Sequence, residues 1–127
     1  MGFTVSVKRT FAASHVIPGY PGLCARLHGH NWTIEAVFKA SALNGLGMAV
    51  DFHEIERWLD PVVSEVDHSH LNDHPFFELR TTTAENIAVF FYRRLSDQLD
   101  GGAEGLSLSR VSVWEMEGYR ATYEESA

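Results

Sequence analysis

Three histidines near the N-terminus have the residue type and spacing of a metal site. His28 and His30 are separated by a single glycine. Residues two apart on an extended backbone project to the same face, so the two imidazoles would point the same way. His15 ends an earlier strand-like run and could arrive from a neighbouring strand. Catalytic zinc sites use three protein ligands and keep one position open. This pattern favours a three-histidine zinc site over histidines that are merely solvated at strand ends.

Cys24 lies four residues before His28, in a loop that also holds prolines and glycines. Arg26 is close by, and a neighbouring cation raises the thiolate fraction of a cysteine. Two roles remain open. The thiol could exchange protons with a substrate, or it could be a fourth zinc ligand that closes the site. A small buried hydrophobic side chain is the ordinary alternative.

Two acidic residues further along the chain are candidates for chemistry. Asp67 precedes His68, and an aspartate beside a histidine can orient the ring and raise its basicity. A solvated helix-to-loop junction is the alternative. Glu115 shares the parity of two strand valines, so it could be partly buried. A buried carboxylate needs a partner, either a structural arginine or a ligand rich in N–H groups. An exposed strand-end glutamate is equally compatible with the pattern.

The hydrophobic pattern predicts the elements that must position these residues. Alternation over residues 2–15 and 28–40 predicts two long strands, joined by a loop and paired antiparallel. Asp51 is the expected N-cap of a helix with an apolar stripe at helical spacing. Pro61 lies inside that helix and predicts a kink or a restart there.

The same kinds of pattern predict the elements of the second half of the chain. Thr82 and Glu85 have the spacing of a capping box before a second helix. The stretch 67–80 is too polar for a core helix and is expected to be a loop. Residues 106–116 and 119–124 predict two more strands, with a bulge near Ser109. The order β-β-α-α-β-β predicts an α+β fold, with two helices covering one face of a four-stranded antiparallel sheet.

Composition limits the classes of function. A chain of 127 residues predicts one domain spanning 1–127. The net charge of −7 with neutral histidines disfavours a nucleic-acid partner, which needs a basic surface. No apolar run approaches the roughly 18 residues of a membrane helix, so no membrane partner is expected. The single cysteine excludes an internal disulfide and suits the cytoplasm.

Separated motifs along most of the chain resemble the 6-pyruvoyl-tetrahydropterin synthase/QueD superfamily. In chain order these are Ala12-Ala13-Ser14-His15, Cys24-x-x-x-His28-Gly29-His30, Gly47-Met48 with Asp51-Phe52, Asp67-His68-Ser69-His70-Leu71-Asn72, Thr83-Ala84-Glu85-Asn86 and Val113-Trp114-Glu115. The resemblance implies a tunnelling fold (T-fold), in which subunits join edge to edge into a barrel. It also implies a homo-oligomer, either a trimer or a homohexamer of two trimers, with active sites at subunit interfaces.

The resemblance further implies roles for individual residues. His15, His28 and His30 would bind Zn²⁺, and Cys24 would handle protons at the substrate side chain.

Asp67 and His68 would form the partner acid/base pair, contributed by a neighbouring subunit. Glu115 would anchor a pterin ring through its N–H groups, with help from Thr83.

The gap of three residues between Cys24 and His28 resembles the 6-carboxy-5,6,7,8-tetrahydropterin synthases of queuosine biosynthesis. The expected substrate is 7,8-dihydroneopterin triphosphate, and the expected products are 6-carboxytetrahydropterin, acetaldehyde and triphosphate. Lys8, Arg9 and Arg26 are the candidate phosphate contacts. The alternatives are a 6-pyruvoyl synthase or pterin aldolase-type relative and, in a different class, a non-catalytic metal-binding barrel.

Overall fold

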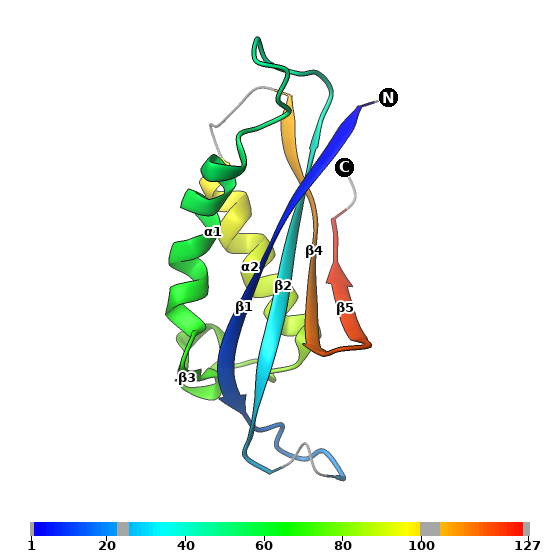
Figure 1. Ribbon diagram of the computed structural model, residues 1–127. Helices are drawn as coiled ribbons and strands as arrows, with labels where there is room; N and C mark the ends of the chain where they lie inside the picture. Colours follow the sequence, from blue (N-terminus) through cyan, green and yellow to red (C-terminus); the bar gives the residue numbers. More distant parts are fainter. Residues whose placement is uncertain (1, 23–25, 100–104, 126–127) are drawn as a thin grey trace.

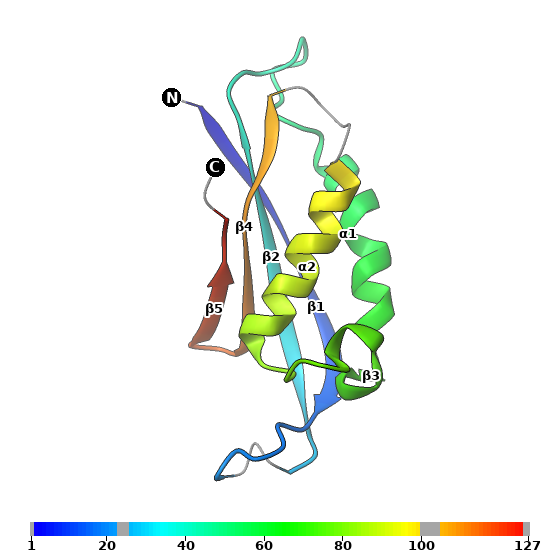
Figure 2. The same cartoon turned by 180° about the vertical axis from the view of Figure 1, so that it is seen from behind.

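A long twisted sheet and two helices form the two layers of the protein, which is described here by a computed structural model (Figures 1 and 2). The structure describes residues 2–22, 26–99 and 105–125. The elements are β1 (Phe3–His15), β2 (His28–Ala40), α1 (Phe52–Val66), β3 (Ser69–His70), the 3₁₀ turns η2 (Leu71–Asp73) and η3 (Pro75–Phe77), α2 (Ala84–Leu99), β4 (Leu106–Met116) and β5 (Tyr119–Tyr123). Both helices cover the same face of the sheet, as the α+β prediction requires.

The pairing of β1 with β2 sets the position of the histidines. The two strands pair antiparallel without interruption, from Phe3 opposite Ala40 to His15 opposite His28. The alternation is interrupted at Arg9 of β1 and Val37 of β2, but it keeps one face of the pair mostly apolar, so the register is strongly specified. The same register places Ala13 opposite His30. The end of β1 and the start of β2 therefore bring three imidazoles to one corner of the sheet.

The sheet has five strands in the order β3-β1-β2-β4-β5, not the expected four. The additional strand, β3, pairs parallel with Ala13 and Ser14 of β1, so the sheet is mixed. β3 was missed because a two-residue strand has no alternation to detect. On the other side of β2, β4 pairs antiparallel with a register shift between Val37 and Phe38, opposite the bulge expected near Ser109.

Helix α1 begins after Asp51, whose side chain accepts a hydrogen bond from the backbone N–H of His53, as predicted. It continues through Pro61 as one helix, without a restart. Proline removes one helical hydrogen bond. Burial of Leu59 and Val62 on either side of Pro61 offsets that loss, because each large apolar side chain contributes about 1.5–3 kcal/mol.

Helix α2 is capped one residue later than the predicted capping box. The hydroxyl of Thr83 accepts the backbone N–H of Asn86 at 3.2 Å, and the helix begins at Ala84. Thr82, the expected cap, is fully buried. Its side chain instead lies beside the histidines at the corner of the sheet.

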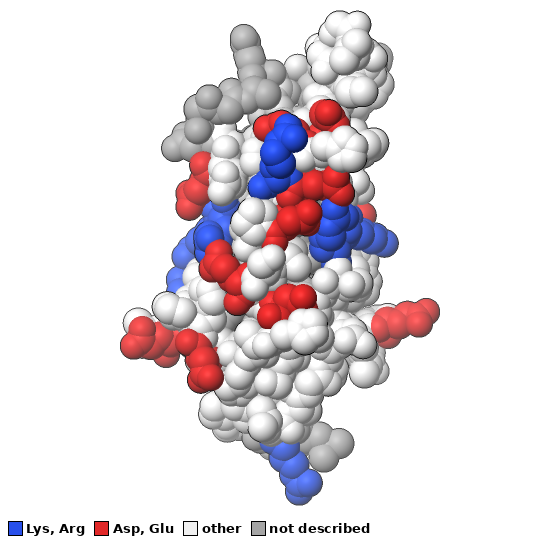
Figure 3. All heavy atoms as spheres, turned by 60° about the vertical axis from the view of Figure 1, so that its left-hand side comes forward, with Lys and Arg blue, Asp and Glu red and all other residues white. Residues whose placement is uncertain are grey.

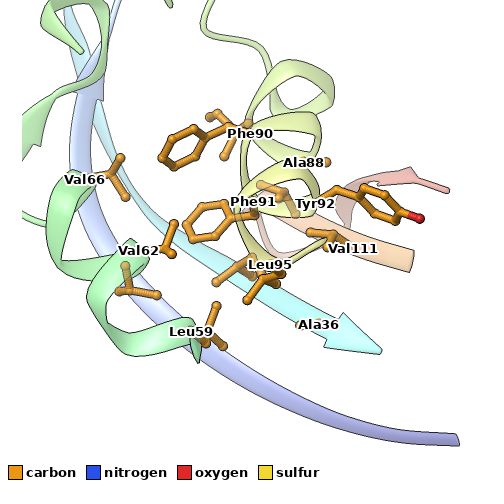
Figure 4. Packing of buried hydrophobic residues seen from close by; sticks show 14 of the residues in the cluster. Ala36, Leu59, Val62, Val66, Ala88, Phe90, Phe91, Tyr92, Leu95 and Val111 are labelled. Carbon is orange, nitrogen blue, oxygen red and sulfur yellow. The ribbon is translucent and has the colours of Figure 1, made fainter. Parts of the chain in front are cut away.

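The core lies between the helix layer and the sheet. Figure 4 shows side chains of both helices meeting over β2 and β4. The labelled residues are Leu59, Val62 and Val66 of α1, Ala88, Phe90, Phe91, Tyr92 and Leu95 of α2, Ala36 of β2 and Val111 of β4. This packing holds the two long strands rigidly, and these strands carry the histidines.

The outer surface on the α1 side carries charged side chains of both signs (Figure 3). Arg9 of β1 pairs there with Glu56 and Asp60 of α1. Exposed pairs of this kind contribute only about 0–1 kcal/mol each. Within the described ranges, no helix has the length and apolar character needed to cross a membrane.

Candidate metal centre

Three strand ends bring four potential metal ligands together. His15 ends β1, His28 and His30 begin β2, and Glu115 lies near the end of β4. One ligand atom from each of these residues lies within 4.8 Å of all the others. The three predicted histidines are thus brought to one place, and the carboxylate joins them.

Backbone carbonyls orient two of the imidazoles. Nδ1 of His15 lies 2.8 Å from the carbonyl oxygen of Thr82, and Nδ1 of His28 lies 2.7 Å from that of Arg26. A carbonyl only accepts, so each Nδ1 carries the proton and donates it. The lone pair is then on Nε2, which is one of the two ring nitrogens that can bind a metal. The backbone therefore selects the tautomer that can coordinate an ion.

The Nε2 atoms of His15 and His30 are buried and have no hydrogen-bond partner among the described residues. An unsatisfied buried polar atom costs about 1–3 kcal/mol, so two in one cluster require an explanation. Burial lowers the pKa of His15, and His28 lowers it further, against the opposing carbonyl of Thr82. His15 is therefore neutral at neutral pH, which is the form that binds a metal. A metal ion would satisfy both nitrogens, so the donor set fits one.

Trp32 and Thr82 support the cluster, although neither was a predicted site residue. The indole of Trp32 packs edge-on against His15 and His30, with ring centroids 4.9 and 5.4 Å apart. Its Nε1 donates to the carbonyl of Ala13 at 3.2 Å. The Thr82 hydroxyl donates to the carbonyl of Val16 at 3.2 Å. Trp32 lies two residues after His30 and therefore shares its face of β2, but no sequence signal places Thr82 there.

Glu115 directs its carboxylate into the cluster. Its Oε1 atom lies 2.9 Å from Nε2 of His30, 3.7 Å from that of His15 and 4.0 Å from that of His28. No arginine forms an ion pair with Glu115 in the part of the chain that the structure describes. Only 25% of its side chain is exposed. The sequence left open a structural arginine partner or a freely exposed glutamate, and among the described residues the structure shows neither.

A cavity of about 600 Å³ opens beside the cluster. This volume is in the range of small-molecule sites. Its lining is mostly apolar, with a few polar groups at one place. The residues are Arg26, Leu27, His28, His30, Glu115, Met116 and Tyr119. The cavity can therefore hold a flat organic ligand next to a metal ion.

Asp67 and His68 form a pair outside this cavity. Nδ1 of His68 lies 3.0 Å from Oδ1 of Asp67, and the same oxygen accepts the backbone N–H of Ala12 at 2.9 Å. The Ala12 N–H, with a contribution from His68, lowers the pKa of Asp67. His68 has a φ of 57°, a left-handed conformation that is rare for non-glycine residues. Its side chain is 82% exposed, and neither residue of the pair lines the cavity beside the histidine cluster.

The remaining predicted site residues are dispersed. Cys24 lies outside the described residues. Thr83 caps α2 and is absent from the cavity lining. Of the three candidate phosphate contacts, Arg9 is held by acidic residues of α1, Lys8 lies 5.0 Å from the ring centre of Trp114, and Arg26 lines the cavity.

Comparisons with known proteins agree with this geometry. The family model described as 6-pyruvoyl tetrahydropterin synthase matches residues 4–126. A 6-carboxy-5,6,7,8-tetrahydropterin synthase of Synechocystis sp. is 33% identical, covering 76% of this chain and 75% of the relative. A dihydroneopterin monophosphate aldolase of Pyrococcus furiosus is 36% identical, covering 70% of each chain.

A solved structure shares the fold. The 6-pyruvoyl tetrahydropterin synthase of Caenorhabditis elegans superposes with a TM-score of 0.85, covering 99% of this chain and 97% of that one at 23% identity. The expected T-fold is thereby confirmed, with β3 as an added strand. A family match over nearly the whole chain, a shared fold and a clustered set of the motif histidines lead to one conclusion: the chain belongs to the 6-pyruvoyl tetrahydropterin synthase family.

Proposed function

We propose that the protein is a zinc-dependent 6-carboxy-5,6,7,8-tetrahydropterin synthase. It converts 7,8-dihydroneopterin triphosphate to 6-carboxytetrahydropterin, acetaldehyde and triphosphate, in queuosine biosynthesis. The observation that carries the proposal is the cluster of His15, His28 and His30 beside a cavity of small-molecule size. The name of the Synechocystis relative supports this reaction within the family.

Zinc is the proposed ion because the three histidines offer neutral nitrogen donors, a set that zinc prefers. Bound there, the ion would supply Lewis acidity to the hydroxyl groups of the substrate side chain. The Thr82 and Arg26 carbonyls keep two of the Nε2 lone pairs available for it. Trp32 packs against the rings and restricts their rotation.

The pterin ring is proposed to lie in the cavity with its N–H edge toward Glu115. A carboxylate accepts two N–H groups in one plane, so it fixes the orientation of such a ring. Thr83 is the proposed second contact at this edge. Arg26 is the proposed triphosphate contact, because it alone of the three candidate cations lines the cavity among the described residues.

Protons are proposed to move through Cys24 on one side and the Asp67–His68 pair on the other. Asp67 is already hydrogen-bonded and holds His68 in position, which leaves the far nitrogen of the ring free to transfer a proton. Because His68 does not line the cavity of its own chain, we assign it to the cavity of a neighbouring subunit. The open edges support this, since among the described residues β5 pairs only with β4, and β3 covers only Ala13 and Ser14 of β1. A homotrimer, stacked into a hexamer, would close these edges.

The test is product identification after incubation with 7,8-dihydroneopterin triphosphate. We expect acetaldehyde and 6-carboxytetrahydropterin in equal amounts from the zinc-loaded protein, and none from a His28→Ala variant. A 6-pyruvoyl product without acetaldehyde would contradict the carboxy assignment.

The aldolase-type alternative has its own support in the Pyrococcus furiosus relative. The same assay with dihydroneopterin monophosphate separates the two. Turnover of the monophosphate with no turnover of the triphosphate would establish the alternative. Zinc binding with no turnover of either compound would leave the non-catalytic metal-binding barrel.

A further inference from the structure

Glu115 stands where the fourth donor of a tetrahedral site would stand. With metal bonds of about 2.0–2.1 Å to nitrogen or oxygen, neighbouring donors of a tetrahedral zinc site lie about 3.4 Å apart. The Oε1 atom of Glu115 lies 2.9, 3.7 and 4.0 Å from the three histidine nitrogens. These distances bracket the tetrahedral edge. The carboxylate oxygen is nearest to His30, and each of its three distances departs from that edge by about 0.6 Å or less.

The contact with His30 is not an ordinary hydrogen bond. Nε2 of His30 remains without a hydrogen-bond partner despite its 2.9 Å separation from Oε1, because the ring is not aimed at that oxygen. A nitrogen and an oxygen that are close but not aligned are expected when both point to a common centre.

The strand pairing is irregular at Glu115. The pairing of β4 with β5 shifts register between Trp114 and Met116, which leaves Glu115 as the extra residue of a bulge. Its pairing with β2 ends at Trp114. Bulges aim a side chain away from the regular pleat and free it from the hydrogen-bond ladder. Glu115 can thus turn between two neighbours, the histidine cluster and the cavity, because it belongs to the lining of both.

We infer that Glu115 is the fourth protein donor to the metal in the substrate-free chain, and that it leaves the metal when a ligand rich in N–H groups enters the cavity. The identity of that ligand as a pterin rests on the proposed function. Exchange of the carboxylate for a substrate oxygen conserves the number of donors and needs no proton transfer. Only a ligand that also binds the carboxylate of Glu115 can then reach the metal. Recognition of the ring by Glu115 and access of the ligand to the metal therefore occur in the same step.

The first test measures zinc affinity without any pterin. Metal-stripped full-length protein is titrated with zinc against a competing chelator, for the native chain, Glu115→Gln, Glu115→Asp and the control Glu117→Gln. Glu117 is two residues away and outside the cluster. We expect Glu115→Gln to weaken zinc binding by about 10–100-fold, as loss of a supporting metal-site residue does, and Glu117→Gln to leave it unchanged.

Glu115→Asp separates ligation from charge. It keeps the negative charge but is one methylene shorter, so a ligand would be lost while an electrostatic effect would remain. Affinity close to that of Glu115→Gln supports ligation. Native affinity in either Glu115 variant overturns it, and circular dichroism of the metal-free variants confirms that they fold.

The second test follows the exchange itself. In the cobalt-substituted protein, the visible bands report the donors of the ion. Neopterin, which has the pterin N–H edge but no triphosphate, should change these bands in the native chain and in Glu117→Gln, and leave them nearly unchanged in Glu115→Gln. Neopterin that binds the native chain without changing the bands refutes the exchange. Neopterin that does not bind at all contradicts the proposed pterin function, while the zinc titration still decides the ligation.

Discussion

The histidine cluster and the Asp67–His68 pair are both proposed to do chemistry, yet they differ in nearly every physical respect. The cluster is built from strand ends over a packed core, and it holds two buried nitrogens without partners among the described residues. The pair stands on a turn after α1, and its carboxylate is hydrogen-bonded to Ala12 and paired with His68. His68 is 82% exposed, whereas His15 is fully buried.

This difference separates two kinds of site. The cluster has the donor set for an ion, since its donors converge within 4.8 Å and two of their nitrogens have no partner among the described residues. The pair has the arrangement for proton transfer, since Asp67 is held by Ala12 and His68 is exposed. A metal site should fail when a donor is removed. A proton-transfer pair should fail only in turnover.

The largest expected effect is the loss of a cluster histidine. His30→Ala removes one nitrogen donor and leaves two imidazoles with Glu115, whose carboxylate lies closest to the removed ring. We expect zinc content to fall well below one ion per chain, and turnover to fall below detection. Metal analysis and the acetaldehyde assay measure the two effects.

The matched control is His53→Ala. His53 is also paired with a glutamate, Glu56, but it lies on α1 with 79% of its side chain exposed. It should retain both zinc and activity. A His30→Ala protein that keeps one firmly bound zinc would remove the distinction between the two regions.

The next effect concerns the pair. His68→Gln removes a proposed general acid or base, which contributes about 10²–10⁴-fold to rate. We expect turnover to fall by that range while zinc content stays at the native level. The ratio of activity to bound zinc is the deciding quantity. If turnover and zinc content fall together, His68 supports the histidine cluster and does not transfer protons.

Co-expression of two inactive variants sharpens the comparison further. If a complete site takes its cluster from one subunit and its pair from another, chains with His28→Ala and chains with His68→Gln complement each other. Random assembly from equal amounts should restore about a quarter of the native sites in a cyclic oligomer. Activity no higher than in the separate variants would show that each chain uses its own His68.

The cluster was largely predictable from the sequence, and the reason is strand alternation. Largely regular alternation over thirteen residues in each of β1 and β2 favours a register that places His15 opposite His28. Alternation does not give strand order, however. Nothing in the sequence placed the end of β4 beside the start of β2, so Glu115 was expected to face a ligand and not the histidines themselves.

The supporting residues were less predictable, because their roles depend on tertiary placement. Thr82 looks like a helix cap by its spacing, but burial draws it to His15 and leaves Thr83 to cap α2. β3 is held by its parallel pairing with β1, for which two residues give no pattern. For the Asp67–His68 pair, the sequence gives the neighbouring residue types but not the left-handed turn that exposes His68.

The smallest expected effect is a pH dependence that belongs to the pair. The Ala12 N–H and His68 lower the pKa of Asp67 in the folded chain. A carboxyl group with a lowered folded pKa adds stability above its unfolded pKa of about 3.9, and this stability is lost as the pH falls through the folded pKa. Asp67→Asn should therefore be less stable than the native chain at neutral pH, with a difference that shrinks below about pH 4. Urea unfolding of the metal-free proteins at several pH values measures this difference without interference from the cluster. A difference in the free energy of unfolding that stays constant down to pH 3 would mean that the charge of Asp67 does not contribute to stability. The contrast with the histidine cluster would then rest on exposure and not on charge.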